Sequence, residues 1–397
     1  MIDLRLADRM AGLGTETAFE VLAKARELER TGRSIVHLEI GEPDFDTPEH
    51  IKEAAIQALR DGQTHYTPAA GIFEAREAVA DHVEAVRKVP VDPAEVVMTP
   101  GSKPIMFFSI LALVNPGDEV IYPDPGYPIY ESVTKFVGGV PKALPLREEN
   151  GFRIDPDELR ALATPKTRLI VINTPHNPCG STLTRADLEA IADVAERHDA
   201  YVLADEIYWQ ITYDGVHTSI MSLPGMKRRT ILLDGFSKAY AMTGWRLGYG
   251  VMRQELAQRI AQLMVNSNSC AAAFTQIAGI AALRGPHAPV AAMVAEFRRR
   301  RDVIVSGLNA VDGMSCTVPS GAFYAFPGVK RIDADSKRLA EHLLTNGGVA
   351  CLSGTAFGRQ GQGYLRFSYA NNIENITEGL RRVRDAVGRY RAGVGSS

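Results

Sequence analysis

Lys238 is the residue of this chain whose type and setting point most directly to chemistry. It follows the apolar run 231–233 and stands eight residues before Arg246. An amine and a guanidinium in one pocket suit an aldehyde that carries a phosphate, because the amine can form an imine and the guanidinium can bind the phosphate through paired hydrogen bonds. Most lysines are solvated, but the neighbours of Lys238 are mainly apolar residues and glycines, which favours a functional role.

Asp205 could supply the counter-charge for a cofactor ring. It ends the apolar run 201–204, and a carboxylate at a buried strand end is unfavourable unless it meets a cation. A protonated pyridine nitrogen would be such a cation, and the ion pair would keep the ring an electron sink. Taken alone, the position is explained equally well by an aspartate that caps a helix.

Further polar residues could bind the other parts of such a cofactor. Asn177, in a turn with two prolines and a glycine, and Tyr208 could each donate to a phenolate oxygen. The backbone amides of 101–103, where a helix is expected to begin, could cradle a phosphate. Tyr127 could stack on a flat ring. Each residue alone is more often structural, as a turn, a helix start or a packed aromatic side chain.

The elements expected to position these residues form a mainly parallel α/β sheet. Short runs rich in Val and Ile, without alternation of apolar and polar residues, are typical of strands buried on both faces, and helical patterns lie between them. Ligands bind such sheets at the carboxyl ends of the strands, where all the candidate segments fall. The predicted strands cover residues 96–99, 119–122, 169–173, 201–204, 230–233 and 247–251.

The chain has 397 residues, which exceeds what one core usually supports, so two domains are expected. In the carboxyl-terminal third, strands at 321–326 and 363–369 and a helix from about Asn375 predict a smaller α+β domain. The arginine run 298–301 is expected to form a solvated helix face rather than a nucleic-acid site. The tail 392–397 is expected to be disordered.

Composition narrows the class of partner. A net charge of -3, from 44 basic and 47 acidic residues, offers no field that favours nucleic acid or an anionic membrane. The four cysteines show no CxxC spacing, which argues against zinc and against a secreted disulfide framework and favours the cytoplasm. The charged amino terminus predicts no signal peptide, and no apolar run approaches the roughly 20 residues that span a bilayer. Small molecules or other protein chains are the expected partners.

Several segments match one known family in order along the chain. The most specific are Ser237-Lys238 through Thr243-Gly244-Trp245-Arg246, Asn177-Pro178-Cys179-Gly180 and Asp205-Glu206-Ile207-Tyr208, and a further match is Gly321-Ala322-Phe323-Tyr324. With them the chain resembles, over nearly its whole length, the class I and II pyridoxal-phosphate aminotransferases of fold type I. The resemblance implies a large cofactor-binding domain with the mainly parallel sheet and a small α+β domain built from both termini. The expected ranges are 1–45 for the amino-terminal arm and part of the small domain, 46–285 for the large domain and 286–397 for the small domain.

The resemblance also implies a role for each candidate in binding pyridoxal 5'-phosphate. Lys238 would form the imine, and Asp205 would pair with the pyridine nitrogen. Asn177 and Tyr208 would hold the ring oxygen, and Tyr127 would cover the ring. The phosphate would be bound by Arg246, Ser237 and the amides of Gly101, Ser102 and Lys103. Gly235 stands where some relatives place a further phosphate-binding serine.

Substrate recognition is expected from a second set of residues. Arg366 would grip the α-carboxylate, with the backbone of Gly41 and the Asn177 side chain beside it. Tyr66 would reach the phosphate of the neighbouring subunit, which implies a homodimer with shared active sites. Lys103 is similar to a lysine that faces the distal carboxylate of the substrate in the aspartate and prephenate branch. Alternatively, Lys103 only caps a helix or meets phosphate.

The expected reaction moves an amino group from aspartate, or from a broad set of L-amino acids, to a 2-oxo acid such as 2-oxoglutarate. Lys238 would carry the α-proton as general base and acid. A first alternative is a β-lyase or oxidase on the same fold. Release of pyruvate and ammonia from a sulfur amino acid would indicate the β-lyase. A second is a non-catalytic sensing module of a transcription regulator, although such relatives carry a DNA-binding domain for which this chain has no room.

Overall fold

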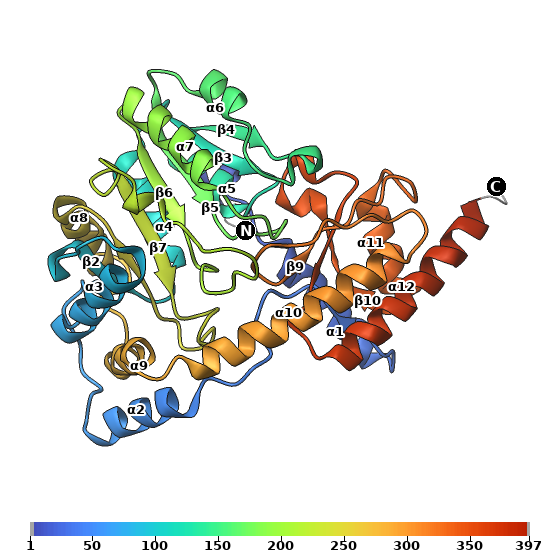
Figure 1. The fold of residues 1–397 in the computed structure, drawn as a ribbon, viewed down its shortest axis with the longest axis horizontal. Helices are drawn as coiled ribbons and strands as arrows, with labels where there is room; N and C mark the ends of the chain where they lie inside the picture. The colour runs from blue at the N-terminus through green and yellow to red at the C-terminus, as the bar shows by residue number, and fades with distance from the viewer. Residues whose placement is uncertain (1–3, 395–397) are drawn as a thin grey trace.

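The computed structural model describes residues 4–394, and its largest layer is a seven-stranded sheet (Figure 1). Its strands are β2 (Val96–Thr99), β3 (Glu119–Asp124), β4 (Val140–Pro145), β5 (Thr167–Asn173), β6 (Tyr201–Asp205), β7 (Thr230–Gly235) and β8 (Gly248–Val251). Their order is β2-β8-β7-β6-β5-β3-β4. Only β8 runs antiparallel to its neighbours, so the predicted mainly parallel sheet is confirmed.

Two layers of helices cover the sheet and explain why its strands lack apolar-polar alternation. Successive strand residues point to opposite faces. On one face, Leu169 and Val171 of β5 belong to the core that includes α4, α5 and α8. On the other, Ile170 and Ile172 pack with α6 and α7, and α2, α3 and α9 continue that layer beside β2, β7 and β8. These helices are α2 (Glu49–Arg60), α3 (Phe73–Arg87), α4 (Lys103–Leu113), α5 (Ile129–Phe136), α6 (Pro156–Leu162), α7 (Arg185–Arg197), α8 (Gln254–Val265) and α9 (Ala273–Arg284).

Local sequence signals set where several of these helices begin. Thr184 caps α7, because its hydroxyl accepts from the backbone of Asp187 and the Asp187 carboxylate accepts from the backbone of Thr184. The two contacts together form a capping box. Helix α4 begins directly after β2 at Lys103 with Pro104 in its first turn, where proline is well tolerated.

A smaller α+β region packs against one end of the large sheet. Strands β9 (Tyr324–Ala325), β11 (Leu352–Ser353) and β12 (Leu365–Ser368) form one small sheet, and β1 (Val36–His37) pairs in parallel with β10 (Val349–Ala350). Around them lie α1 (Thr17–Arg30), α10 (Ala288–Asn309), α11 (Ser336–Thr345) and α12 (Ile373–Val394).

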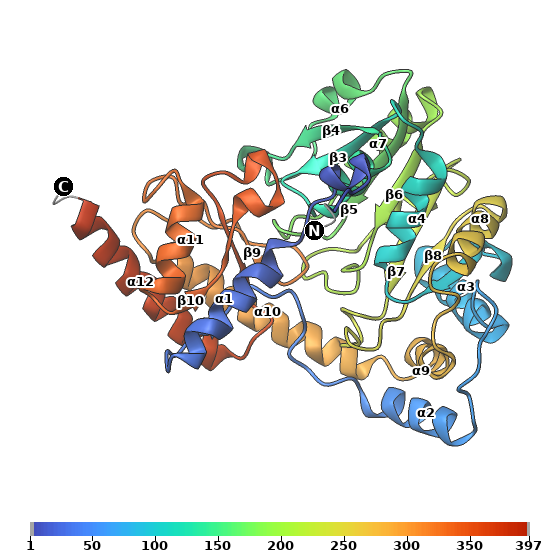
Figure 2. The ribbon, with the colours of Figure 1, turned by 180° about the vertical axis from the view of Figure 1, so that it is seen from behind.

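The small region is built from both ends of the chain, as expected. Val36 and Leu38 share one core with Leu343 and Ile376, and α1 lies beside β10 (Figure 2). The long helix α10 runs from the neighbourhood of α9 to that of α12 (Figure 1). The domain boundaries near residues 45 and 285 stay a prediction.

The structure differs from several expectations, and the short strands β1, β10 and β11 were not predicted. Strand β4 was not predicted, because its prolines and its exposed first residue weaken the strand pattern at a sheet edge. Strand β9 covers only two residues of 321–326. Helix α12 continues to Val394, so part of the tail expected to be disordered is helical, and residues 395–397 lie outside the described residues. Finally, Arg300 and Arg301 are buried rather than solvated.

The burial of those two arginines has a clear cause. Arg300 pairs with Asp44 and lies over the Phe45 ring at 4.7 Å. Arg301 pairs with Asp214 and lies over the Tyr213 ring. A distant carboxylate and an aromatic ring therefore stabilise each of the two buried arginines, and these partners are invisible to a local charge pattern.

The described residues also form six short 3-10 helices. The 3-10 segments are η1 (Asp8–Gly12), η2 (Pro93–Glu95), η3 (Glu148–Asn150), η4 (Ile220–Ser222), η5 (Gly354–Phe357) and η6 (Arg359–Gly361). Within residues 4–394 no single helix is long and apolar enough to cross a membrane. The bent pair α9 and α10, with 78° between them, satisfies length and composition together.

Candidate active site

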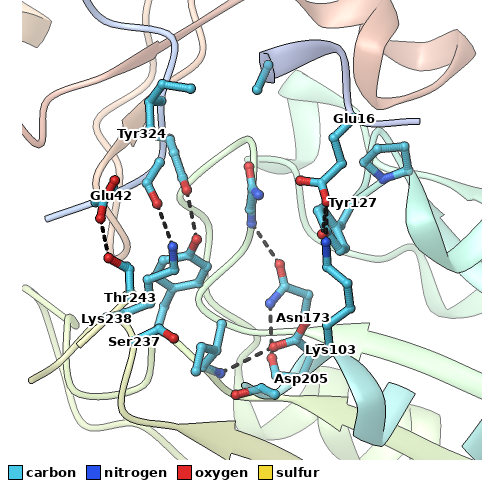
Figure 3. Close-up of a pocket in the computed structure, with 18 of the residues that line it drawn as sticks. Glu16, Glu42, Lys103, Tyr127, Asn173, Asp205, Ser237, Lys238, Thr243 and Tyr324 are labelled. Carbon is cyan, nitrogen blue, oxygen red and sulfur yellow. Dashed lines mark hydrogen bonds and ion pairs between the residues drawn. The ribbon is translucent and has the colours of Figure 1, made fainter. Parts of the chain in front are cut away.

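A pocket of about 560 Å³ opens where β2, β3, β5, β6 and β7 end, and residues of the small region complete its walls (Figure 3). Gly101 adjoins the pocket through Arg246. Tyr66 lies outside it, with 91% of its surface exposed. All other candidate residues line it. They are Gly41, Ser102, Lys103, Tyr127, Asn177, Asp205, Tyr208, Ser237, Lys238, Arg246 and Arg366.

Asp205 lies at the floor of the pocket as the last residue of β6. Its carboxylate accepts a hydrogen bond from the Tyr130 hydroxyl at 2.6 Å and one from the Ile207 amide at 3.3 Å. Burial raises its pKa to about 6, although both hydrogen bonds oppose the rise. The group is thus a carboxylate that a cation in the pocket would stabilise.

Lys238 lies across the pocket, just beyond the end of β7. Its ammonium donates to the Gly41 carbonyl at 2.5 Å and lies 5.7 Å from the centres of the Tyr208 and Phe323 rings. Burial lowers the pKa of this amine to about 8, and the positive Arg366 adds to the effect while Glu42 opposes it. About a tenth of the amine is therefore neutral and nucleophilic at pH 7, and about half at pH 8.

The loop after β2 and the segment after β7 meet as a compact anion site. Gly101 has φ +82°, and a side chain there would collide with the Arg246 guanidinium. Arg246 itself donates to the Thr243 carbonyl at 2.9 Å. The Ser102 hydroxyl donates to the Asp234 carbonyl. Backbone amides at the start of α4 and one guanidinium therefore lie together, as phosphate binding requires.

Gly235 has a steric explanation in this arrangement. A Cβ at this position would lie 2.4 Å from the Ser102 hydroxyl and 2.9 Å from the Gly248 backbone. A serine there would collide with the neighbouring strand and with Ser102. The glycine that departs from the family pattern thus allows Ser102 to approach closely.

Arg366 forms the opposite wall from β12. Its guanidinium donates to Asn177 Oδ1 at 3.2 Å and to the Glu39 carbonyl, and it lies over the Tyr324 ring at 4.5 Å. Its Nε is buried and has no partner among the described residues. Because Asn177 Oδ1 accepts here, the Asn177 NH2 group is left to act as a donor. The Tyr208 hydroxyl shares a hydrogen bond with that of Tyr324 at 2.7 Å.

Behind the floor, one buried arginine joins the ends of two strands. Arg87, from the end of α3, binds Glu206 at 2.9 Å and Asp234 at 2.8 Å. His217 also contacts Glu206, at 3.0 Å. Burial alone would raise the Glu206 pKa, but His217 and Arg87 lower it to about 2. This ion cluster fixes Glu206, directly after Asp205, and Asp234, three residues before Ser237.

Several polar residues of the pocket were not predicted from the sequence. Tyr130 and Asn173 support Asp205, since the Asn173 amide donates to the Asp205 carbonyl at 3.0 Å. Tyr324 stood in a matched segment but had no assigned role. Glu16 directly precedes α1, and its carboxylate reaches into the pocket. There it contacts Lys103 and accepts a hydrogen bond from the Tyr127 hydroxyl. No local pattern marks Glu16, because its partners lie 87 and 111 residues away.

Comparison with known proteins identifies the family. The model for aminotransferase class I and II matches residues 33–383. The chain belongs to this family. It is 40% identical to aromatic-amino-acid aminotransferase 2 of Thermococcus litoralis, over 96% of this chain and 97% of that protein. It is 37% identical to the aspartate aminotransferase of Rhizobium meliloti, over 96% of each chain.

The fold agrees with this assignment. The structure of Thermus thermophilus aspartate aminotransferase with maleate superimposes with a TM-score of 0.93 at 38% identity, covering 97% of this chain and 100% of that one. The chain is thus an aminotransferase of fold type I. Members of this family use pyridoxal phosphate with amino acids and 2-oxo acids.

Proposed function

We propose that this aminotransferase uses pyridoxal 5'-phosphate to move the amino group of aspartate, or of a broader set of L-amino acids, onto a 2-oxo acid such as 2-oxoglutarate. One observation carries the proposal: the low-pKa amine of Lys238 faces the same pocket as the buried carboxylate of Asp205. Burial of either group alone is unfavourable. A ring cation would pair with the Asp205 carboxylate, and an aldehyde on that ring would react with the Lys238 amine.

The residues present fit this cofactor. The buried carboxylate of Asp205 suits a protonated pyridine nitrogen. The tight approach of Gly101 to Arg246 leaves backbone amides and a guanidinium for a phosphate. Tyr208 and the Asn177 NH2 group are suited to the ring oxygen, and Tyr127 to the ring face. When bound, pyridoxal phosphate supplies an aldehyde and a ring that withdraws electrons from the substrate α-carbon.

The chain's own residues then have distinct tasks. Arg366, with its unpartnered Nε, binds the substrate carboxylate and fixes the orientation of the α-carbon. Neutral Lys238 Nζ takes the α-proton and later returns it, as a general base and acid. Asp205 stays ionised above about pH 6 and so stabilises positive charge at the floor. Ser237 adds a hydroxyl donor near the phosphate end, whereas the Ser102 hydroxyl already donates to the Asp234 carbonyl.

We propose a homodimer with shared active sites, in which Tyr66 of each chain reaches the phosphate of the other. Its support is the 91% exposure of Tyr66, an aromatic residue outside the pocket of its own chain. A mixture of Lys238→Ala chains with Tyr66→Glu chains tests this, because heterodimers would hold one site with both residues intact. We expect mixing to restore activity that neither parent shows. A cytoplasmic location also stays a prediction.

The decisive experiment is a screen of amino donors against 2-oxoglutarate, pyruvate and oxaloacetate with the reconstituted enzyme. We expect stoichiometric exchange of amino acid and 2-oxo acid. Lys238→Ala should bind the cofactor without a covalent link and lose turnover, while Lys227→Ala, which removes a lysine paired with Glu95, should match the parent. Release of pyruvate and ammonia from sulfur amino acids, without any acceptor, would instead support the β-lyase alternative.

A further inference from the structure

Glu16 brings a carboxylate into the substrate side of the pocket. Its Oε1 contacts the Lys103 ammonium and accepts a hydrogen bond from the Tyr127 hydroxyl at 2.9 Å (Figure 3). The Glu16 side chain is 23% exposed, against 47% for Lys103. The cation that the sequence suggests for a distal substrate carboxylate is thus already paired with a carboxylate of the protein.

Local structure gives no other reason for these two side chains. Glu16 is the N-cap residue of α1, yet its side chain makes no capping hydrogen bond, and glutamate is not a preferred residue there. Lys103 is the first residue of α4, where a positive charge meets the unfavourable end of the helix dipole. Their side chains therefore gain their contacts from each other and from the pocket, not from the helices they begin.

We propose that Glu16 determines substrate specificity by occupying the position of the distal carboxylate of a dicarboxylic substrate. This inference rests on the proposed function. A neutral or aromatic side chain leaves the Glu16–Lys103 pair in place. A dicarboxylate must displace Glu16 from Lys103, because two carboxylates that share one ammonium repel each other. The pocket therefore favours monocarboxylic donors more than a pocket with a free lysine would.

Binding of maleate to the holoenzyme tests this without turnover. In Glu16→Gln the competing charge is gone, so calorimetry should give a Kd for maleate that is about three- to fivefold lower, the size expected for one partly exposed ion pair. Glu20→Gln is the matched control, because Glu20 lies in the first turn of α1 but binds Thr15 instead of Lys103. Its Kd should stay at the parent value.

Two further measurements complete the test. The ratio of kcat/KM for aspartate to that for phenylalanine should rise in Glu16→Gln by a similar factor. Adding Lys103→Met to Glu16→Gln should remove the gain in maleate affinity. Unchanged or weaker maleate binding in Glu16→Gln would overturn the inference, as would an equal gain in Glu20→Gln. Absence of amino transfer in the parent enzyme would instead overturn the proposed function, which separates the two failures.

Discussion

The floor and the mouth of the pocket are built in different ways. The floor consists of residues at the ends of buried parallel strands, above all Asp205, the last residue of β6, and Lys238, three residues after β7. Each is held by neighbours that the sheet brings into place, and the buried Arg87 ties the two strand ends together. Its geometry is therefore fixed by the most regular part of the fold.

The mouth depends on contacts between distant segments. Glu16 comes from the start of α1, Lys103 from the start of α4 and Tyr127 from the segment after β3. All three side chains are at least partly exposed. One carboxylate oxygen joins them, so the loss of one side chain can change the mouth without disturbing the sheet. Reaction chemistry and substrate choice are thereby assigned to separable parts of the pocket.

The largest expected effect comes from the ion cluster behind the floor. Arg87→Met would leave Glu206 and Asp234 buried without their cation, which should lower the free energy of unfolding by about 3–5 kcal/mol. Denaturant unfolding of the parent and the variant measures this. Arg284→Met is the control, because that arginine binds Glu77 and Asp81 at the surface and should change stability by less than about 1 kcal/mol.

Equal effects of the two arginine variants would mean that the floor is no more constrained than the surface. A stability loss in Arg87→Met with unchanged maleate affinity would show that the mouth is independent of the ion cluster.

Asp205→Asn should have the next largest effect, on turnover. The amide keeps the shape of the carboxylate but loses its charge, so kcat should fall roughly a hundredfold or more, as when a fixed electrostatic contact is removed. Asp199→Asn, at an exposed site just before β6, should be neutral. Single-turnover kinetics would show whether the chemical step is affected, and a fall below twofold would contradict the role of Asp205.

The same contrast explains what could be predicted from the sequence. Asp205, Lys238 and the loop at Gly101 follow runs whose strand character is local, so the fold and the floor were accessible from pattern alone. Glu16 and the buried Arg300 depend on partners far along the chain, 87 residues away for Lys103 and 256 for Asp44. No window of sequence contains such pairs. Strand β4 was missed for a local reason, since an edge strand tolerates the prolines that argue against a central strand.

The pH dependence of cofactor binding should reveal the lowered pKa of Lys238 at the floor. The pKa of Lys238 is lowered to about 8, against an ordinary value of about 10.4. The amine loses its proton as the pH rises through 8, so the rate of pyridoxal phosphate capture by cofactor-free protein should rise roughly tenfold from pH 7 to 9 and then level off. Stopped-flow absorbance measures it. A rise that continues unchanged to pH 10 would show that the pocket does not perturb Lys238.

The smallest expected effect is at the mouth. Tyr127→Phe keeps the aromatic ring but removes the hydroxyl that donates to Glu16. A hydrogen bond to a charged, partly exposed group contributes about 1 kcal/mol, so Glu16 should leave Lys103 more readily and maleate should bind up to about fivefold more tightly. Tyr390→Phe removes a hydroxyl of α12 that donates to Asp333, and it should leave maleate affinity unchanged. If instead Tyr127→Phe weakens maleate binding, the hydroxyl contacts the dicarboxylate itself, and the mouth recognises acidic substrates through Tyr127 rather than excluding them through Glu16.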